Sequence, residues 1–424
     1  MTAPERSGET APPQAPAGTT ADGSRNPFES SRFRRWWLAS MVAGTGIGIQ
    51  SVTVPLYIRD RVAFDDRAVA ISGALIASTL PGAFLALFGG TAADRIEQRR
   101  ILARTYVVGA LVSAFYVLLC VADARIVWPV YPLAALVGAA GAFTNPARQS
   151  MLPQLVGGDA LQNGVIFGTM GFMATLQFLG PSVAGLVTEG FGLAAAFSLE
   201  VGLLLLGALA FSGIRTQPPP RSGRNVLGDL TDGLRYVADQ PALRDVLLLA
   251  AIPGIFFIGP FAVTVPILVP DLFQASDKWV GLLWGAFGGG VFTGSILLTL
   301  RPIPRRGLAV CASTLAGGLL LILYSQSESL HVSAGLLYCW GIGASVFINY
   351  AVALLQHHSA PHMIGRVMSM YTLIFFTASP LGYLQAGLIT DAYGPQTTLL
   401  ASGCVAALVG GSAVLFLRSV RALD

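Results

Sequence analysis

The chain has 424 residues, of which 54% are hydrophobic and only 11% are charged, and its mean hydropathy is +0.65. About a quarter of the residues of an average soluble domain are charged, so this composition excludes an ordinary soluble protein and indicates one surrounded mostly by lipid. The net charge of +4 fits the charge asymmetry that orients membrane proteins, and no nucleic-acid partner is expected. The four cysteines have no metal-like or paired spacing, so no disulfide is predicted.

The first 30 residues are rich in Ala, Pro, Gly, Ser and Thr and contain no apolar run. Such a segment cannot bury enough surface to offset the entropy of ordering, so residues 1–30 are predicted to be a disordered cytoplasmic tail. A basic and aromatic group, Arg34-Arg-Trp-Trp37, then opens a hydrophobic run longer than that of a signal peptide. This run is therefore predicted to be a retained membrane helix, anchored by these residues at the interface.

Twelve apolar runs are long enough for a transmembrane helix, which needs about 20 residues. They cover 36–58, 69–92, 101–122, 128–147, 161–188, 193–213, 246–269, 279–300, 307–325, 332–355, 367–390 and 396–417. Prolines in the fifth and seventh runs predict kinks, which helices in lipid tolerate when neighbours satisfy the freed carbonyl groups. The fold class is therefore all-α and integral to the membrane.

The distribution of basic residues predicts the orientation. With both termini in the cytoplasm, 21 of the 26 Lys and Arg residues lie on inner connections and 5 on outer ones. An odd number of helices would destroy this asymmetry, so it supports an even count by the positive-inside rule. A multi-pass protein of the cell inner membrane is predicted.

One long internal connection, 214–245, divides the chain, and its apolar spacing over 227–236 predicts a short surface helix. Gly185-Leu-Val-Thr-Glu-Gly-Phe-Gly192 closely matches Gly387-Leu-Ile-Thr-Asp-Ala-Tyr-Gly394, and each ends the fifth predicted helix of its half. We therefore predict six-helix bundles over 31–213 and 246–424, joined by the linker. Duplicated six-helix halves characterise a major transporter architecture, here expected to be a monomer.

The connection after the second predicted helix reads Gly89-Gly-Thr-Ala-Ala-Asp-Arg-Ile-Glu-Gln-Arg-Arg100. It resembles the signature loop of the major facilitator superfamily, with Glu97 in place of a glycine. The matching residues are Gly90, Asp94, Arg95, Arg99 and Arg100. The resemblance implies that Asp94 locks an inward gate by pairing across the halves near Gly365-Arg366. Without it, an ordinary positively charged loop is an equally good interpretation.

A second resemblance lies in the fifth predicted helix, where Gly180, Pro181 and Gly185 match the glycine–proline motif of proton-coupled drug antiporters. Leu176 and Ala184 stand where that motif usually has glycine. The resemblance implies export of substrate against proton entry. The alternative is a kinked helix that uses small residues for packing.

A branch-level resemblance covers residues 33–417. Segments around Asn145-Pro-Ala-Arg148, Asp232-Gly-Leu-Arg235 and Gly365-Arg366 are similar to bacterial siderophore exporters and macrolide efflux pumps. The superfamily implies a path lined by the first, fourth, seventh and tenth helices. The polar residues chosen there, with one from the fifth helix, are Gln50, Thr53, Gln177, Asn349 and Tyr350. None is charged, which favours a neutral or amphipathic substrate, although interhelical hydrogen bonding is an alternative role for each.

Glu200 is the one carboxylate well inside a predicted span. A charged side chain is costly at that depth, so an acid there is a candidate proton site. A protonated or paired structural acid is the alternative, and the sequence leaves both open.

These observations predict a secondary active transporter that exports a small amphipathic compound, such as a drug, antibiotic or siderophore-like metabolite, by proton antiport and alternating access. Import or facilitated diffusion on the same fold is the alternative. An enzyme is not expected, because the spans offer a single acid and no nucleophile with a base. No cofactor or metal is expected either: there is no phosphate-binding loop, and His357, His358 and His362 lack a nearby Cys or acid.

Overall fold

The computed structural model describes residues 26–93, 96–216 and 233–423, and over these ranges the chain forms helices and contains no strand. The first half begins with the short turn η1 (Pro27–Glu29) and contains η2 (Phe64–Asp66) between its first two long helices. Its long elements are α1 (Ser31–Arg59), α2 (Arg67–Ala93), α3 (Gln98–Val121), α4 (Val130–Leu155), α5 (Gly158–Ala174), η3 (Thr175–Leu179), α6 (Gly180–Phe191) and α7 (Leu193–Ser212).

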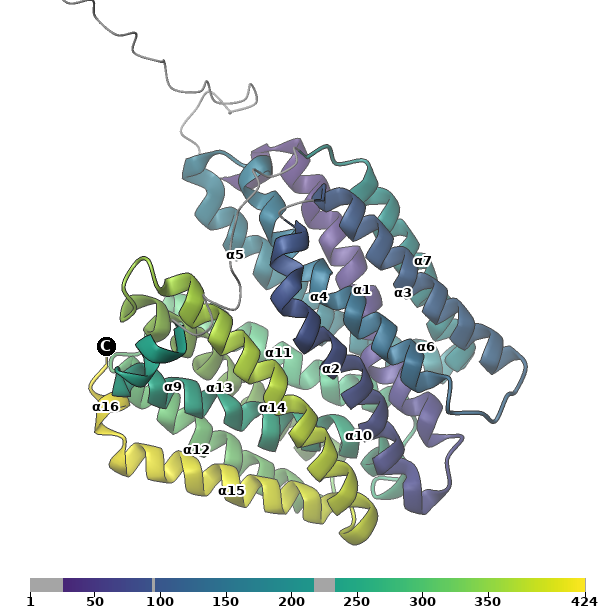
Figure 1. Cartoon of the computed structure of the whole chain (residues 1–424). Helices are drawn as coiled ribbons and strands as arrows, with labels where there is room; N and C mark the ends of the chain where they lie inside the picture. Colours follow the sequence, from purple (N-terminus) through teal and green to yellow (C-terminus); the bar gives the residue numbers. More distant parts are fainter. Residues whose placement is uncertain (1–25, 94–95, 217–232, 424) are drawn as a thin grey trace, which may run out of the picture.

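The second half repeats this pattern of long antiparallel helices (Figure 1). Its elements are α9 (Pro241–Ile252), η4 (Pro253–Ile258), α10 (Gly259–Asp271), α11 (Lys278–Leu300), α12 (Arg306–Ser325), α13 (Leu330–His357), α14 (Ile364–Tyr393), α15 (Pro395–Phe416) and α16 (Arg418–Arg421). Because α5, η3 and α6 form one continuous unit, as do α9, η4 and α10, the described residues make twelve helical units of membrane-spanning length. The predicted fold class is confirmed.

Eleven of the twelve units are also apolar enough to cross a membrane, and α4 is the exception. The sequence predicted that this helix ends at residue 147, where the apolar run stops, but it continues to Leu155. Its last turns carry polar residues on one side and bury Met151, Leu152 and Leu155 on the other. An amphipathic extension of this kind escapes a search for apolar runs.

The predicted kinks take the form of π-helical turns. In the fifth unit η3 directly precedes Gly180-Pro181, and in the seventh η4 begins at Pro253. Proline has no N–H to donate and its ring crowds the preceding turn, so the helix widens locally where prolines occur. Both wide turns lie in the middle of long helices.

The aromatic residues at the start of α1 are packing residues. Trp36 is fully buried, and Trp37 Nε1 donates a hydrogen bond to the carbonyl of Phe167 at 3.0 Å. Phe28, which the sequence placed in the tail, packs edge-on against Phe33, Trp37 and Phe167 with ring centroids 5.1–5.5 Å apart. Defined structure therefore begins before residue 31. The Phe28 ring packs against rings of two later helices, and the composition of the tail does not reveal these contacts.

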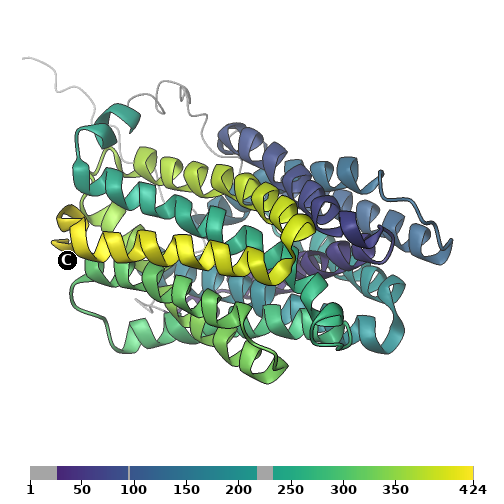
Figure 2. The same ribbon diagram turned by 90° about the horizontal axis from the view of Figure 1, so that it is seen from below.

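Close packing through glycine holds the helices together, as between α12 and α15, which run side by side (Figure 2). A side chain on Gly318 of α12 would overlap the backbone of Ala407, and one on Gly403 of α15 would approach Gly318. Helices in lipid gain little from hydrophobicity when they associate, so small residues that let backbones approach supply the contact.

Gly318→Leu is expected to lower the free energy of unfolding by about 1–3 kcal/mol, because the added atoms force α12 and α15 apart. Thermal unfolding in detergent measures the effect. Gly335→Leu is the matched control, because nothing lies within 4 Å of a side chain added at that position in α13. Equal melting temperatures for the two variants would contradict this account of the packing.

Candidate functional site

Polar contacts join the two halves at one end of the molecule. We call this the distal end, where α1 ends and α2 begins; the proximal end carries the start of α1 and α16. Figure 1 shows the halves inclined so that they converge at the distal end. The Arg59 guanidinium forms a bidentate contact with Asp277 across the halves, at 2.7 and 3.1 Å, and also pairs with Asp60. The Arg67 guanidinium lies 3.9 Å from the Asp271 carboxylate, also across the halves.

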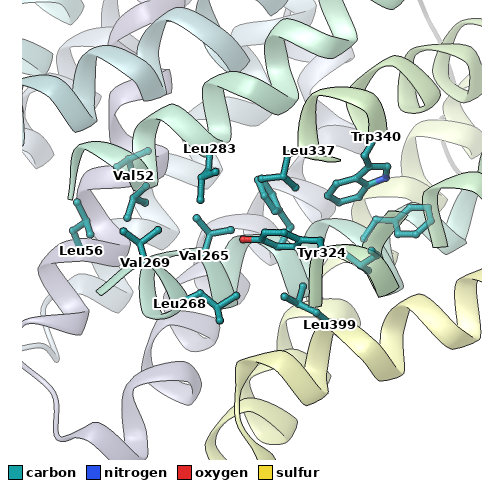
Figure 3. Packing of buried hydrophobic residues seen from close by; sticks show 14 of the residues in the cluster. Val52, Leu56, Val265, Leu268, Val269, Leu283, Tyr324, Leu337, Trp340 and Leu399 are labelled. Atoms are coloured by element: carbon teal, nitrogen blue, oxygen red, sulfur yellow. The ribbon is translucent and has the colours of Figure 1, made fainter. Parts of the chain in front are cut away.

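Buried apolar side chains from both halves also pack together in one cluster (Figure 3). Val52 and Leu56 of α1 belong to the same buried cluster as Val265 and Val269 of α10 and Leu283 of α11. Each of these side chains is fully buried. Both halves therefore contribute buried apolar side chains to one cluster, in addition to the ion pairs at the distal end.

A seam of glycines brings α11 against the fifth helical unit of the other half. Side chains on Gly281, Gly285 and Gly288 would overlap the carbonyl of Pro181, the Ser182 side chain and the backbone of residue 177, respectively. The spacing of four and three residues puts these glycines on one face of α11. Each glycine leaves room for the opposing helix, and at Gly281 and Gly288 the two halves touch backbone to backbone.

The antiporter-like motif lies where this seam meets α1. Gly180 packs against Gly48 and the carbonyl of Thr45, while Gly185 packs against Lys278 and Gly281 of α11. The helix that carries the motif is thereby held between α1 on one side and α11 on the other. Pro181 and Gly185 thus lie at the interface between the halves, whereas Gly180 packs against α1 within the N-terminal half.

The predicted substrate residues occupy different environments. Gln50 and Gln177 are partly buried, and Gln177 Nε2 lies 3.8 Å from Met173 Sδ. Thr53 is fully buried and donates to the carbonyl of Ile49 at 3.2 Å.

The two residues predicted on the tenth helix also have partners within the C-terminal half. Exposed Asn349 donates from Nδ2 to Ser295 Oγ at 3.2 Å, and the Tyr350 hydroxyl accepts a hydrogen bond from the N–H of Ile303 at 2.7 Å. No hydrogen bond joins the side chains of these five residues to one another in the described parts of the chain, so their role in a path stays a prediction.

Part of the signature loop, including Asp94, Arg95 and the surroundings of Gly90, lies outside what the structure describes. Downstream, Glu97 forms ion pairs with Arg99 at 2.5 Å and with Arg100 at 3.0 Å. The acid that replaces the family glycine is therefore paired with both basic residues, which lie in the first turn of α3. Whether this loop acts as a gate stays a prediction.

Glu200 is fully buried between α7 and α3, where it accepts a hydrogen bond of 2.6 Å from the Ser113 hydroxyl. Its other oxygen has no hydrogen-bond partner among the described residues. Phe197 and Tyr116 stack beside it with ring centroids 4.9 Å apart. This pocket lies within the N-terminal half, away from the glycine seam. Among the described residues, no cluster of His, Cys, Asp and Glu could hold a metal, and that includes the three histidines.

Sequence reasoning missed the interface between the halves. Arg59 and Asp277 each sit at the end of an apolar run, and nothing in the sequence pairs residues 218 positions apart. The glycine seam did leave a signal, because Gly281, Gly285 and Gly288 recur at helical spacing in one run. A second missed feature is Arg148, which is buried with its guanidinium 3.9 Å from the centre of the Phe172 ring.

Comparisons with known proteins agree with this fold. Residues 22–424 match the family described as Transmembrane secretion effector. The multidrug efflux pump Tap of Mycobacterium tuberculosis is 28% identical over 91% of this chain and 93% of its own length. The enterobactin exporter EntS of Escherichia coli is 27% identical, covering 92% of each chain. Macrolide efflux protein A of Streptococcus pyogenes is 22% identical over 88% of this chain and 92% of its own.

A solved structure also superimposes on nearly the whole chain. It is a bacterial homologue of the human lysosomal transporter Spinster in an inward-facing and unoccupied conformation, with a TM-score of 0.71 at 14% identity, covering 93% of this chain and 98% of that one. The resemblance to the siderophore-exporter and macrolide-efflux branch is confirmed. The chain therefore belongs to the Transmembrane secretion effector family of membrane transporters, within the major facilitator superfamily.

Proposed function

We propose that this protein exports a small amphipathic compound from the cytoplasm by alternating access, in exchange for protons. The relatives aligned over about nine tenths of the chain are named as efflux pumps or exporters of drugs, macrolides and a siderophore. Their shared direction of transport supports export here. The compound class is proposed only as drug-like or siderophore-like, because the relatives differ among themselves.

Three kinds of contact between the halves support this mechanism: the ion pairs at the distal end, the apolar cluster and the glycine seam. The basic residues of the sequence predict that this end faces outward. A transporter closed on its outer side is ready to load substrate from the cytoplasm. Opening to the outside then requires that the contacts of Arg59 and the seam separate while contacts on the inner side form.

The candidate path residues support an uncharged or amphipathic substrate. Gln50 and Gln177 are partly buried on the two N-terminal helices that meet at the seam, and they offer amide groups without charge. Uncharged donors and acceptors among apolar side chains fix the orientation of a ligand through a few hydrogen bonds, while the apolar surface provides most of the affinity. Import on the same fold would use the same residues, and the direction of the ion gradient separates the two functions.

Export is tested in inverted membrane vesicles that contain the full chain, by measuring uptake of a panel of fluorescent macrolide-like and catecholate compounds under an imposed proton gradient. We expect gradient-dependent accumulation of at least one compound. Asp94→Asn is the matched variant, expected to insert normally yet lose transport because it removes the proposed gate charge. Accumulation only under the reversed gradient would favour import, and normal transport by the Asn variant would contradict the gate assignment.

Gly288→Val is expected to abolish export while leaving the protein in the membrane. The added side chain would overlap the backbone of Gln177, so the seam between α11 and the fifth unit could no longer close. The adjacent Gly289→Val is the control, because the nearest atoms to an added Cβ there lie at an ordinary contact distance of 3.6 Å. Equal transport rates for the two variants in the same vesicle assay would show that the seam is not part of the cycle.

Glu200 is expected to act as a structural acid, because it lies between α3 and α7 and its described partner is Ser113. Glu200→Gln keeps an acceptor for that hydroxyl and should retain proton-driven export. Glu200→Leu removes the acceptor and should destabilise the protein by about 1–3 kcal/mol. Parallel measurements of transport and thermal unfolding test both statements. If the Gln variant binds substrate yet loses gradient-driven accumulation, Glu200 is instead the coupling proton site.

A further inference from the structure

The duplicated segment of the sequence ends α6 in one half and α14 in the other. Its first copy spans Gly185 to Gly192 and its second copy Gly387 to Gly394. The function proposed above assigns no role to most of its residues. The structure shows that the two copies make the same kind of contact, each with the opposite half.

Both copies have the same backbone path. Each ends its helix with a glycine at positive φ, +83° for Gly192 and +88° for Gly394, and the next helix begins at the following residue. The glycine N–H donates to the threonine carbonyl four residues earlier, at 2.9 Å in the first copy and 2.8 Å in the second. Because side chains other than glycine strain this conformation, the last glycine fixes the turn.

The first glycine of each copy lies against the beginning of a helix from the other half. A side chain on Gly185 would approach Lys278, the first residue of α11. One on Gly387 would overlap Ser72 and approach the carbonyl of Ala68, in the first two turns of α2. The helices approached, α2 and α11, are the second long units of their respective halves, so the contact is duplicated along with the sequence.

The acid of each copy stands four residues after the first glycine, on the same face of its helix. The Asp391 carboxylate accepts hydrogen bonds from the N–H groups of Ala68 at 3.0 Å and Val69 at 2.9 Å, which belong to the first turn of α2. Glu189 lies 3.6 Å from the ammonium group of Lys278 at the first turn of α11. Asp391 therefore places negative charge at the positive end of α2, and Glu189 pairs with the side chain of the first residue of α11.

We propose that the two copies form a duplicated clasp that holds the distal end closed, and that Glu189 and Asp391 are its gate residues. In each copy the first glycine lets the helices touch, and the acid then binds the first turn of a helix in the other half, through backbone N–H groups for Asp391 and through the Lys278 side chain for Glu189. This inference deepens the alternating access proposed above and rests on it. The contact of Asp391 is expected to be stronger than that of Glu189. Asp391 accepts two charge-assisted hydrogen bonds, whereas Glu189 and Lys278 form a partly exposed ion pair.

The clasp is tested by electron paramagnetic resonance distances in the full chain without substrate or ion gradient. Spin labels are placed on cysteines introduced at exposed distal positions, Ala122 and Gln396, after the native cysteines are replaced. Asp391→Asn should move the distribution to longer distances, with about a tenfold rise in the ratio of distal-open to distal-closed molecules. Glu189→Gln should move it less, and the double variant most.

Gly387→Ala reaches the same clasp by a steric route, since its methyl group would overlap Ser72 Oγ, and it should also lengthen the distances. Two controls are matched to these changes. Glu328→Gln alters an exposed acid of the same distal end, and Gly190→Ala adds a methyl group with nothing within 4 Å. Neither control should change the distribution.

Unchanged distances in both Asp391→Asn and Gly387→Ala, with normally folded protein, would overturn the clasp. Equal shifts in the Glu328 control would also overturn it, because the effect would then reflect loss of charge in general. The measurement needs no transported compound, so a failure of the export assay leaves the clasp result standing. Conversely, if the distance distributions of these variants are unchanged and the protein exports normally, the clasp proposal is wrong and the proposed function still holds.

Discussion

Backbone-to-backbone contact through glycine is the constraint on which the structure depends. Lipid is as apolar as the side chains, so a hydrophobic surface by itself gives two helices little reason to pair. The 49 glycines of the chain supply close approach instead, both within a half, as between Gly318 and Ala407, and between halves, as between Gly288 and Gln177. The same device thus builds a permanent core and an interface that has to open.

What distinguishes the interface from the core is the set of groups beside the glycines. The distal closure adds ion pairs such as Arg67–Asp271 at 3.9 Å and Lys278–Glu189 at 3.6 Å, and partly exposed pairs of this kind contribute at most about 1 kcal/mol each. Arg59 is more deeply buried and bonds to two carboxylates and a carbonyl, so it is harder to release. A closure assembled from several modest contacts can be reversed by the differential binding of a ligand, since a shift from 1:99 to 99:1 takes about 5.5 kcal/mol.

The ion pairs at the distal end also differ from those of the signature segment. On the distal side, acids meet partners in the opposite half, as Asp277 meets Arg59. In the signature segment, Glu97 instead pairs with its sequence neighbours Arg99 and Arg100, within its own half. The replacement of a glycine by Glu97 therefore adds a local acid partner for these two arginines.

The sequence by itself determined the number, approximate extent and chemical class of the helices, because the bilayer demands about 20 apolar residues for each span and leaves a long, readable pattern. It also revealed the duplicated segment at Gly185 and Gly387 and the motifs that identify the family. It missed the extension of α4 to Leu155, because an amphipathic turn carries no apolar run. Only the tertiary structure decided which helices of the two halves touch, that Arg59 reaches Asp277, and that Glu200 faces Ser113. Such contacts join residues far apart in the chain, and their pairing depends on the relative placement of whole helices, which local composition and spacing do not encode.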